Sequence, residues 1–152
     1  TFIATANIGN EYTATRQLDK ALLDRFTVIE MDLLTQEEEY GLLKYMFPTV
    51  EEKTLENVSN ITSLTRAEAD TENPRISSGV STRTSVEIAG LLFDGFSLLE
   101  SADITIYPQY DSTGGADSER TFVKQIVQKF VSDGSSDELF TEHDVDDTDS
   151  DF

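Results

Sequence analysis

The spacing of apolar residues changes near residue 34, and this change divides the chain into two parts. In the first part, residues 1–7 form an apolar run and residues 26–33 alternate around β-branched residues, which predicts two short strands. Residues 8–16 contain Gly and Asn and are typical of a loop, while residues 17–25 carry apolar side chains at helical spacing. A strand, a loop, a short helix and a second strand indicate a fragment of an α/β layer.

In the second part the apolar residues recur only at helical spacing. Thr35 is placed to cap a helix with an acidic first turn, and Pro48 is placed to end it. Further helices are predicted around residues 55–61, over residues 81–96 and over residues 122–130, where the apolar stripe is cleanest. This half of the chain therefore predicts a small domain of three or four helices.

The stretches between these predicted helices carry turn-forming or polar residues. Residues 66–79 are polar and end in "NPRISSG", and residues 101–118 contain Pro108 and a pair of glycines, so both stretches are expected to be irregular. At the start of the helix over residues 81–96, Thr84 and Glu87 have the spacing of a capping box.

Charge is distributed unevenly along the chain, whose formal net charge is -19. Residues 1–131 carry 21 acidic and 11 basic side chains, whereas residues 132–152 carry 9 acidic and no basic ones. The composition of the last segment predicts a disordered acidic tail. The acidity of both parts argues against direct binding to nucleic acid or to anionic membranes.

These patterns predict three segments: an α/β fragment over residues 1–33, an all-α domain over residues 34–131 and the acidic tail over residues 132–152. The chain has no cysteine, which fits a reducing cytoplasm. No apolar run approaches the roughly 18 residues that a membrane span needs. Because Thr1 already lies inside a strand-like run, we expect the chain to be the C-terminal part of a longer protein.

Three polar side chains stand where a ligand could reach them. Asn7 ends the first predicted strand, where ligands of α/β sheets bind, although asparagine is also common in strand-to-loop turns. Arg25 could bind a phosphate, or it could form an ion pair with Asp24 or Asp19. Arg83 lies at the first turn of a helix, where the dipole disfavours cations, so it either points outward or meets an anion such as a nucleotide phosphate.

The strings "FIATAN", "LDKALLDRF" and "GVSTR" occur in this order. In this order and spacing the chain resembles the C-terminal half of a AAA+ ATPase of the MoxR type, close to the CbbQ/NorQ and cobaltochelatase-subunit branch. The resemblance covers residues 1–131. It implies that Asn7 is the sensor 1 residue that positions the attacking water, that Arg25 is the arginine finger with Arg16 as a second candidate, and that Arg83 is the sensor 2 residue on a helical lid.

The resemblance also implies cofactors and partners. ATP and Mg²⁺ would be bound by a hexameric ring in which the finger reaches a neighbour's nucleotide, and hydrolysis would drive chaperone-like remodelling or cofactor loading of a client. A partner that carries a von Willebrand factor A domain is common in this family. The chain contains neither the G-x-x-x-x-G-K-[ST] loop nor an apolar strand that ends in Asp-Glu. We expect both elements upstream of Thr1, so these 152 residues alone are predicted to be inactive.

A non-enzymatic function is the alternative interpretation. An acidic helical adaptor or decoy for basic surfaces would use the charge of -19, with Leu139, Phe140 and Phe152 as apolar anchors of a docking tail. His143, the one histidine, lacks the fixed neighbouring ligands of a metal site.

Overall fold

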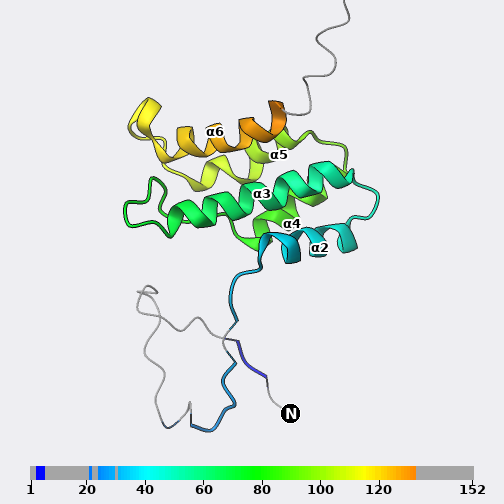
Figure 1. Ribbon diagram of the computed structural model, residues 1–152, viewed down its shortest axis with the longest axis vertical. Coiled ribbons are helices and arrows are strands. Elements are labelled where there is room, and N and C mark those ends of the chain that lie inside the picture. The colour runs from blue at the N-terminus through cyan, green and yellow to red at the C-terminus, as the bar shows by residue number, and fades with distance from the viewer. Residues whose placement is uncertain (1–2, 6–20, 22–23, 30, 133–152) are drawn as a thin grey trace, which may run out of the picture. The chain divides into compact units, whose positions relative to one another are not determined.

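The computed structural model describes residues 3–5, 21, 24–29 and 31–132 (Figure 1). The chain divides into two compact units, Thr1–Asp32 and Leu33–Phe152, and each is described by itself. Within the part of the chain that is described, no helix combines the length and the apolar character that crossing a membrane requires.

The predicted α/β fragment is wrong, because the described residues of the N-terminal unit form no strand. Residues 3–5, 24–29 and 31–33 adopt turns or irregular backbone. A strand is stabilised by neighbouring strands and by burial of one face, and alternating side chains alone supply neither. Apolar side chains in these runs are strongly exposed: Ile3 86%, Ile29 79% and Met31 88%. Of the predicted helix over residues 17–25, Ala21 is helical and residues 24–25 form a turn, while the rest lies outside the described residues.

The described part of the second unit is helical (Figure 1). Its central helix α3 packs against α2, α4 and α6, and α5 packs against α4 and α6. The predicted helices after Thr35, around residues 55–61, over 81–96 and over 122–130 are confirmed as α2, α3, α4 and α6. The elements are α2 (Gln36–Met46), α3 (Glu52–Ala69), α4 (Thr82–Phe93), α5 (Leu98–Thr105), the 3-10 turns η1 (Tyr107–Gln109) and η2 (Gly115–Asp117), and α6 (Glu119–Ser132).

The core lies where the apolar stripes of these helices face one another. Val58 on α3, Ile88 on α4 and Val127 on α6 are all buried, as the helical spacing predicts. Two aromatic side chains at the end of the helix predicted over residues 81–96 are exposed, because they lie where α4 ends and in the turn that follows it. These are Phe93, 58% exposed, and Phe96, 44% exposed.

Two stretches that were predicted as loops are partly helical. Helix α3 continues through Ala69, into the stretch predicted as a loop, and α5 ends only at Thr105. In α5 the hydroxyl of Ser101 donates to the carbonyl of Ser97 (2.8 Å), and that of Thr105 donates to the carbonyl of Ser101 (2.7 Å). These bonds satisfy the two hydroxyl groups inside the helix, while the buried Leu98 and Ala102 and the cap at Ser97 stabilise it.

Helix α4 begins one turn before the predicted cap. Ser81, rather than Thr84, is the N-cap residue, and its hydroxyl accepts a hydrogen bond from the amide of Thr84 (3.2 Å). The predicted capping box of Thr84 and Glu87 is therefore wrong, because both residues lie inside the helix.

The start of α5 is a capping box that lowers the pKa of Glu100. The carboxylate of Glu100 accepts from the hydroxyl (2.7 Å) and the amide (2.9 Å) of Ser97, and these two bonds lower the pKa of Glu100. The resulting stabilisation is present above the ordinary pKa of glutamate and is lost as the pH falls through the lowered folded-state pKa. Ser97→Ala removes the hydroxyl but keeps the backbone amide, so it should raise the pKa of Glu100 part of the way to its ordinary range. Loss of the N-cap hydroxyl should cost about 1 kcal/mol of stability.

An NMR titration of the carboxyl groups, together with urea unfolding, would measure both effects. Glu38, which forms its own capping box with Thr35, is the internal control, because its pKa is lowered by a separate cap that Ser97→Ala leaves intact. A normal pKa for Glu100 in the unaltered chain would contradict the prediction.

Candidate functional site

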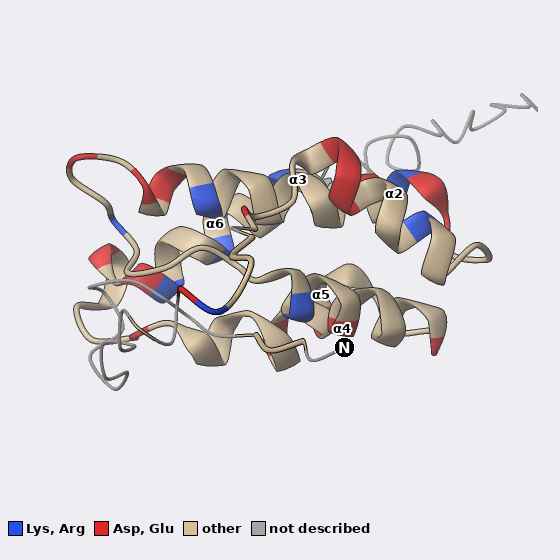
Figure 2. Ribbon diagram, turned by 90° about the horizontal axis from the view of Figure 1, so that it is seen from below, with Lys and Arg blue, Asp and Glu red and all other residues tan. Residues whose placement is uncertain are grey.

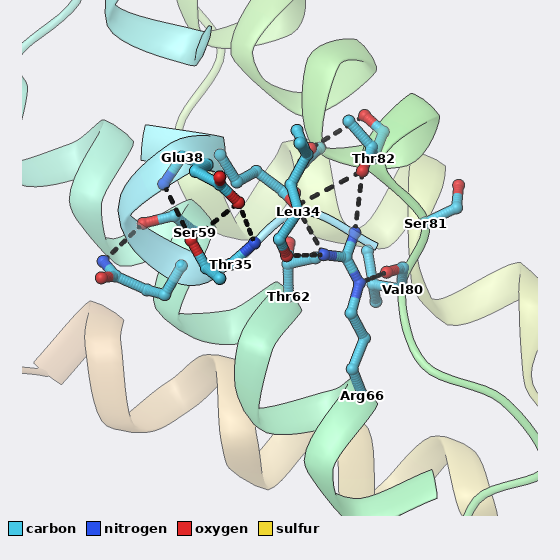
Figure 3. A network of polar contacts seen from close by, with 12 residues as sticks. Leu34, Thr35, Glu38, Ser59, Thr62, Arg66, Val80, Ser81 and Thr82 are labelled. Carbon is cyan, nitrogen blue, oxygen red and sulfur yellow. Dashed lines mark hydrogen bonds and ion pairs between the residues drawn. The ribbon is translucent and has the colours of Figure 1, made fainter. Parts of the chain in front are cut away.

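The guanidinium of Arg66 on α3 joins three segments of the helical unit (Figure 3). Its Nη1 donates to the carbonyl of Leu34 (3.1 Å) and to Oε2 of Glu39 on α2 (2.6 Å). Its Nε donates to the carbonyl of Val80 (2.9 Å), and its Nη2 donates to Oγ1 of Thr82 (3.1 Å). One planar group therefore links Leu34, which lies before the cap of α2, to the helix α2 itself and to the start of α4.

The carboxylate of Glu39 completes this network. Its side chain is only 1% exposed and that of Arg66 is 12% exposed, so the ion pair is largely removed from water. Oε2 also accepts a long hydrogen bond from the hydroxyl of Thr82 (3.4 Å), whereas Oε1 has no hydrogen-bond partner among the described residues. A buried charge is costly unless it is paired, so each member of the pair depends on the other.

Gly79 lets the loop before α4 approach the backbone of α3. A Cβ atom on Gly79 would lie 2.5 Å from Cα of Arg66 and 2.8 Å from its amide nitrogen, so only glycine fits there. The next residue, Val80, donates its amide to Oγ1 of Thr65 (3.0 Å). Close packing and hydrogen bonding thus hold this loop against α3 directly beside Arg66.

Arg83 lies on the first turn of α4, and hydrogen bonds of the neighbouring residues fix this turn. Ser81 caps the turn, Thr82 is bound by Arg66, and Oγ1 of Thr84 accepts a hydrogen bond from Gln109 (3.1 Å). The side chain of Arg83 is exposed, and within the described residues it makes no hydrogen bond or ion pair. A free cation is therefore presented at the end of a helix that attracts anions.

The other predicted site residues belong to the N-terminal unit. Arg25 is exposed in a turn and, among the residues that are described, forms no ion pair with Asp24. Asn7 and Arg16 lie outside the described residues, as does Asp19, the other suggested partner of Arg25. Arg25 and Arg83 are thus each described within their own unit.

The described residues offer no ready site for Mg²⁺ and no broad basic surface. Within the described ranges, no group of three or more His, Cys, Asp or Glu side chains could hold a metal ion. Figure 2 shows Lys and Arg scattered over several helices and interspersed with Asp and Glu. What this part of the chain offers an anion is therefore the exposed guanidinium of Arg83 at the start of α4.

The sequence contains a signal for the Arg66 network. Glu39 lies four residues before the buried Leu43, and Arg66 lies one turn after Thr62, so helical spacing places both on the buried faces of their helices. A charged residue at such a position on each of two neighbouring helices predicts a buried ion pair. The three consecutive glutamates at the start of α2 and the assignment of Arg66 to a loop concealed this pattern.

Comparison with known proteins adds one partial similarity. No family model matches the chain. A stretch of 100 residues, 66% of the chain, is 35% identical to "Putative chaperone BssE" of Thauera aromatica and covers 33% of that protein. The chain thus spans about a third of the length of this relative. Over the matched stretch it is similar to a chaperone-like protein.

Proposed function

We propose that the helical unit is the lid of an ATP-driven chaperone of the AAA+ class and MoxR type. In this proposal ATP binding and hydrolysis in a hexameric ring are coupled to the remodelling or activation of a client protein. The similarity to a protein named as a chaperone supports the general function. The chain would act in the cytoplasm, with a von Willebrand factor A protein as a candidate partner.

The observation that carries the proposal is Arg83 on the first turn of α4, which has no ion-pair partner among the described residues. The helix dipole makes this an unfavourable place for a cation unless an anion lies nearby. A guanidinium and a helix N-terminus together suit a phosphate group. The Arg66 network holds this turn in place, so Arg83 would meet a nucleotide with little loss of conformational freedom.

In the proposed ring the chain supplies charge and orientation. ATP with Mg²⁺ supplies the phosphoryl group that is transferred to water. Arg83 would bind a phosphate oxygen from the lid, and Arg25, with Arg16 as the second candidate, would stabilise negative charge on a neighbouring subunit's nucleotide. Asn7 would orient the attacking water. The phosphate-binding loop and the Mg²⁺ ligands would come from residues outside these 152.

The test is ATP turnover by the complete product of the reading frame. Arg83→Ala should raise the KM for ATP about tenfold or more, the cost of one lost charge-assisted hydrogen bond. Arg75→Ala is the matched control, because Arg75 is also an exposed arginine of the helical unit and should leave KM unchanged. An unchanged KM in Arg83→Ala, or a reading frame without a phosphate-binding loop, would contradict the proposal.

An acidic adaptor remains the second candidate because of the charge of -19. A protein of this kind would bind basic surfaces through scattered carboxylates and would lose affinity as salt is added. Binding of such an adaptor to a basic surface would not require Arg25 or Arg83. Alanine at either position would then leave its binding unchanged, whereas the ATPase requires both.

A further inference from the structure

We infer that Arg66 is a positioning residue that couples the point where the chain enters the helical unit to the first turn of α4. Movement of the backbone at Leu34 would thereby be transmitted to the turn that carries Arg83. The coupling itself is argued from the contacts of Arg66, and only its use in placing Arg83 on a phosphate rests on the proposed function.

The geometry leaves little freedom in the link. The planar guanidinium binds Leu34 and Glu39 through one nitrogen and Thr82 through another, so neither side can shift without breaking a bond. Val80 is bound through the third nitrogen. A lysine could not replace this arrangement, because an ammonium lacks the rigid fork of donors.

The stem of Arg66 is fixed as firmly as its end. Gly79 packs on its backbone, and a Cβ there would also lie 2.6 Å from Cγ of Arg66. The carboxylate of Glu39 holds the guanidinium from the α2 side at 2.6 Å. A side chain held at both ends transmits a displacement, whereas an exposed and flexible ion pair would absorb it.

Thr82 is the position at which the bonds from α4 itself can be removed with the ion pair left in place, while the bond from Arg66 to the carbonyl of Val80 remains. Thr82→Val keeps the shape of the side chain and removes the hydroxyl that joins α4 to Arg66 and Glu39. Thr82→Ser restores the hydroxyl. Thr84→Val makes the same replacement in the same helical turn, but Thr84 contacts Ser81 and Gln109 and makes no hydrogen bond to Arg66 or Glu39.

The experiment is amide hydrogen exchange on the chain without nucleotide. The amide of Ser85, bonded to Ser81, reports on the start of α4, and the amide of Glu39, bonded to Thr35, reports on the start of α2. In Thr82→Val both amides should exchange about tenfold faster, while Val127 in the core of α6 is unchanged. Thr82→Ser should return both to the original rates. Thr84→Val should affect Ser85 alone.

The results that would contradict the coupling differ from the result that would contradict the proposed function. An unchanged Glu39 amide in Thr82→Val, or an equal response of Glu39 to Thr84→Val, would overturn the coupling. Equal acceleration of Val127 would show general destabilisation, which also overturns it. If the coupling is observed while Arg83→Ala leaves the KM for ATP unchanged, the coupling stands and the proposed ATPase function fails.

Discussion

Replacing Arg25 with alanine is expected to lower ATP turnover of the complete gene product by about 10³–10⁵-fold. The expected loss is large because an arginine finger stabilises charge that develops during phosphoryl transfer. Arg25 is suited to act on another subunit, since it is exposed and forms no ion pair among the described residues. Steady-state turnover at saturating ATP measures the effect.

A mixing experiment shows whether the finger acts between subunits. Arg25→Ala subunits are combined with subunits that keep Arg25 but cannot bind ATP. Turnover should return, because the second kind of subunit supplies the finger to the first. Arg16→Ala, tested in parallel, distinguishes the two candidate fingers. If ATP turnover is unchanged in both Arg25→Ala and Arg16→Ala, the acidic adaptor is the better interpretation.

The largest loss of stability is expected for Arg66→Ala. The substitution leaves the carboxylate of Glu39, which is 1% exposed, without its cation, and it frees the carbonyl groups of Leu34 and Val80. Breaking a buried pair from one side costs about 3–5 kcal/mol. Urea unfolding followed by circular dichroism on the chain measures the change in the free energy of unfolding.

Two further variants identify the cause of that loss. Arg75→Ala removes the pair with Glu68, in which the arginine side chain is 67% exposed, and the contact of the guanidinium with the Phe122 ring (3.9 Å). Together these losses should cost less than about 2 kcal/mol. The double variant Arg66→Met with Glu39→Leu should be less destabilised than Arg66→Ala, because no charge remains buried. A loss below about 1 kcal/mol in Arg66→Ala would show that water reaches Glu39 and that the pair contributes little.

Helices could be predicted from this sequence where apolar spacing and caps agree. Thr35 and its acidic first turn correctly marked α2, and the stripe through Val123 and Val127 correctly marked α6. The predicted strands were wrong because alternation does not show whether neighbouring strands exist. The loop assigned to residues 66–79 was partly wrong because burial of Arg66 depends on acceptors 14 and 32 residues away.

The candidate site was predictable only in its exposed part. A cation at a helix N-terminus can be recognised from local sequence, and this placed Arg83 on the first turn of a helix. Glu39, Gly79 and Thr82 gain their importance from contacts across the fold, so local patterns carry little information about them. The assignments of Asn7 and Arg16 fall outside the described residues and stay predictions.

The bond from Arg66 to the carbonyl of Leu34 limits how this domain can be exchanged between proteins. A fragment that began at the capping residue Thr35 would look complete by helix boundaries, yet Nη1 of Arg66 would lose this acceptor. Because the acceptor is a main-chain carbonyl, any residue can supply it, provided that the backbone before the cap follows the same path. A graft of the helices therefore has to keep at least one residue before Thr35 in the backbone conformation of Leu34, whereas this bond does not depend on the side chain of that residue.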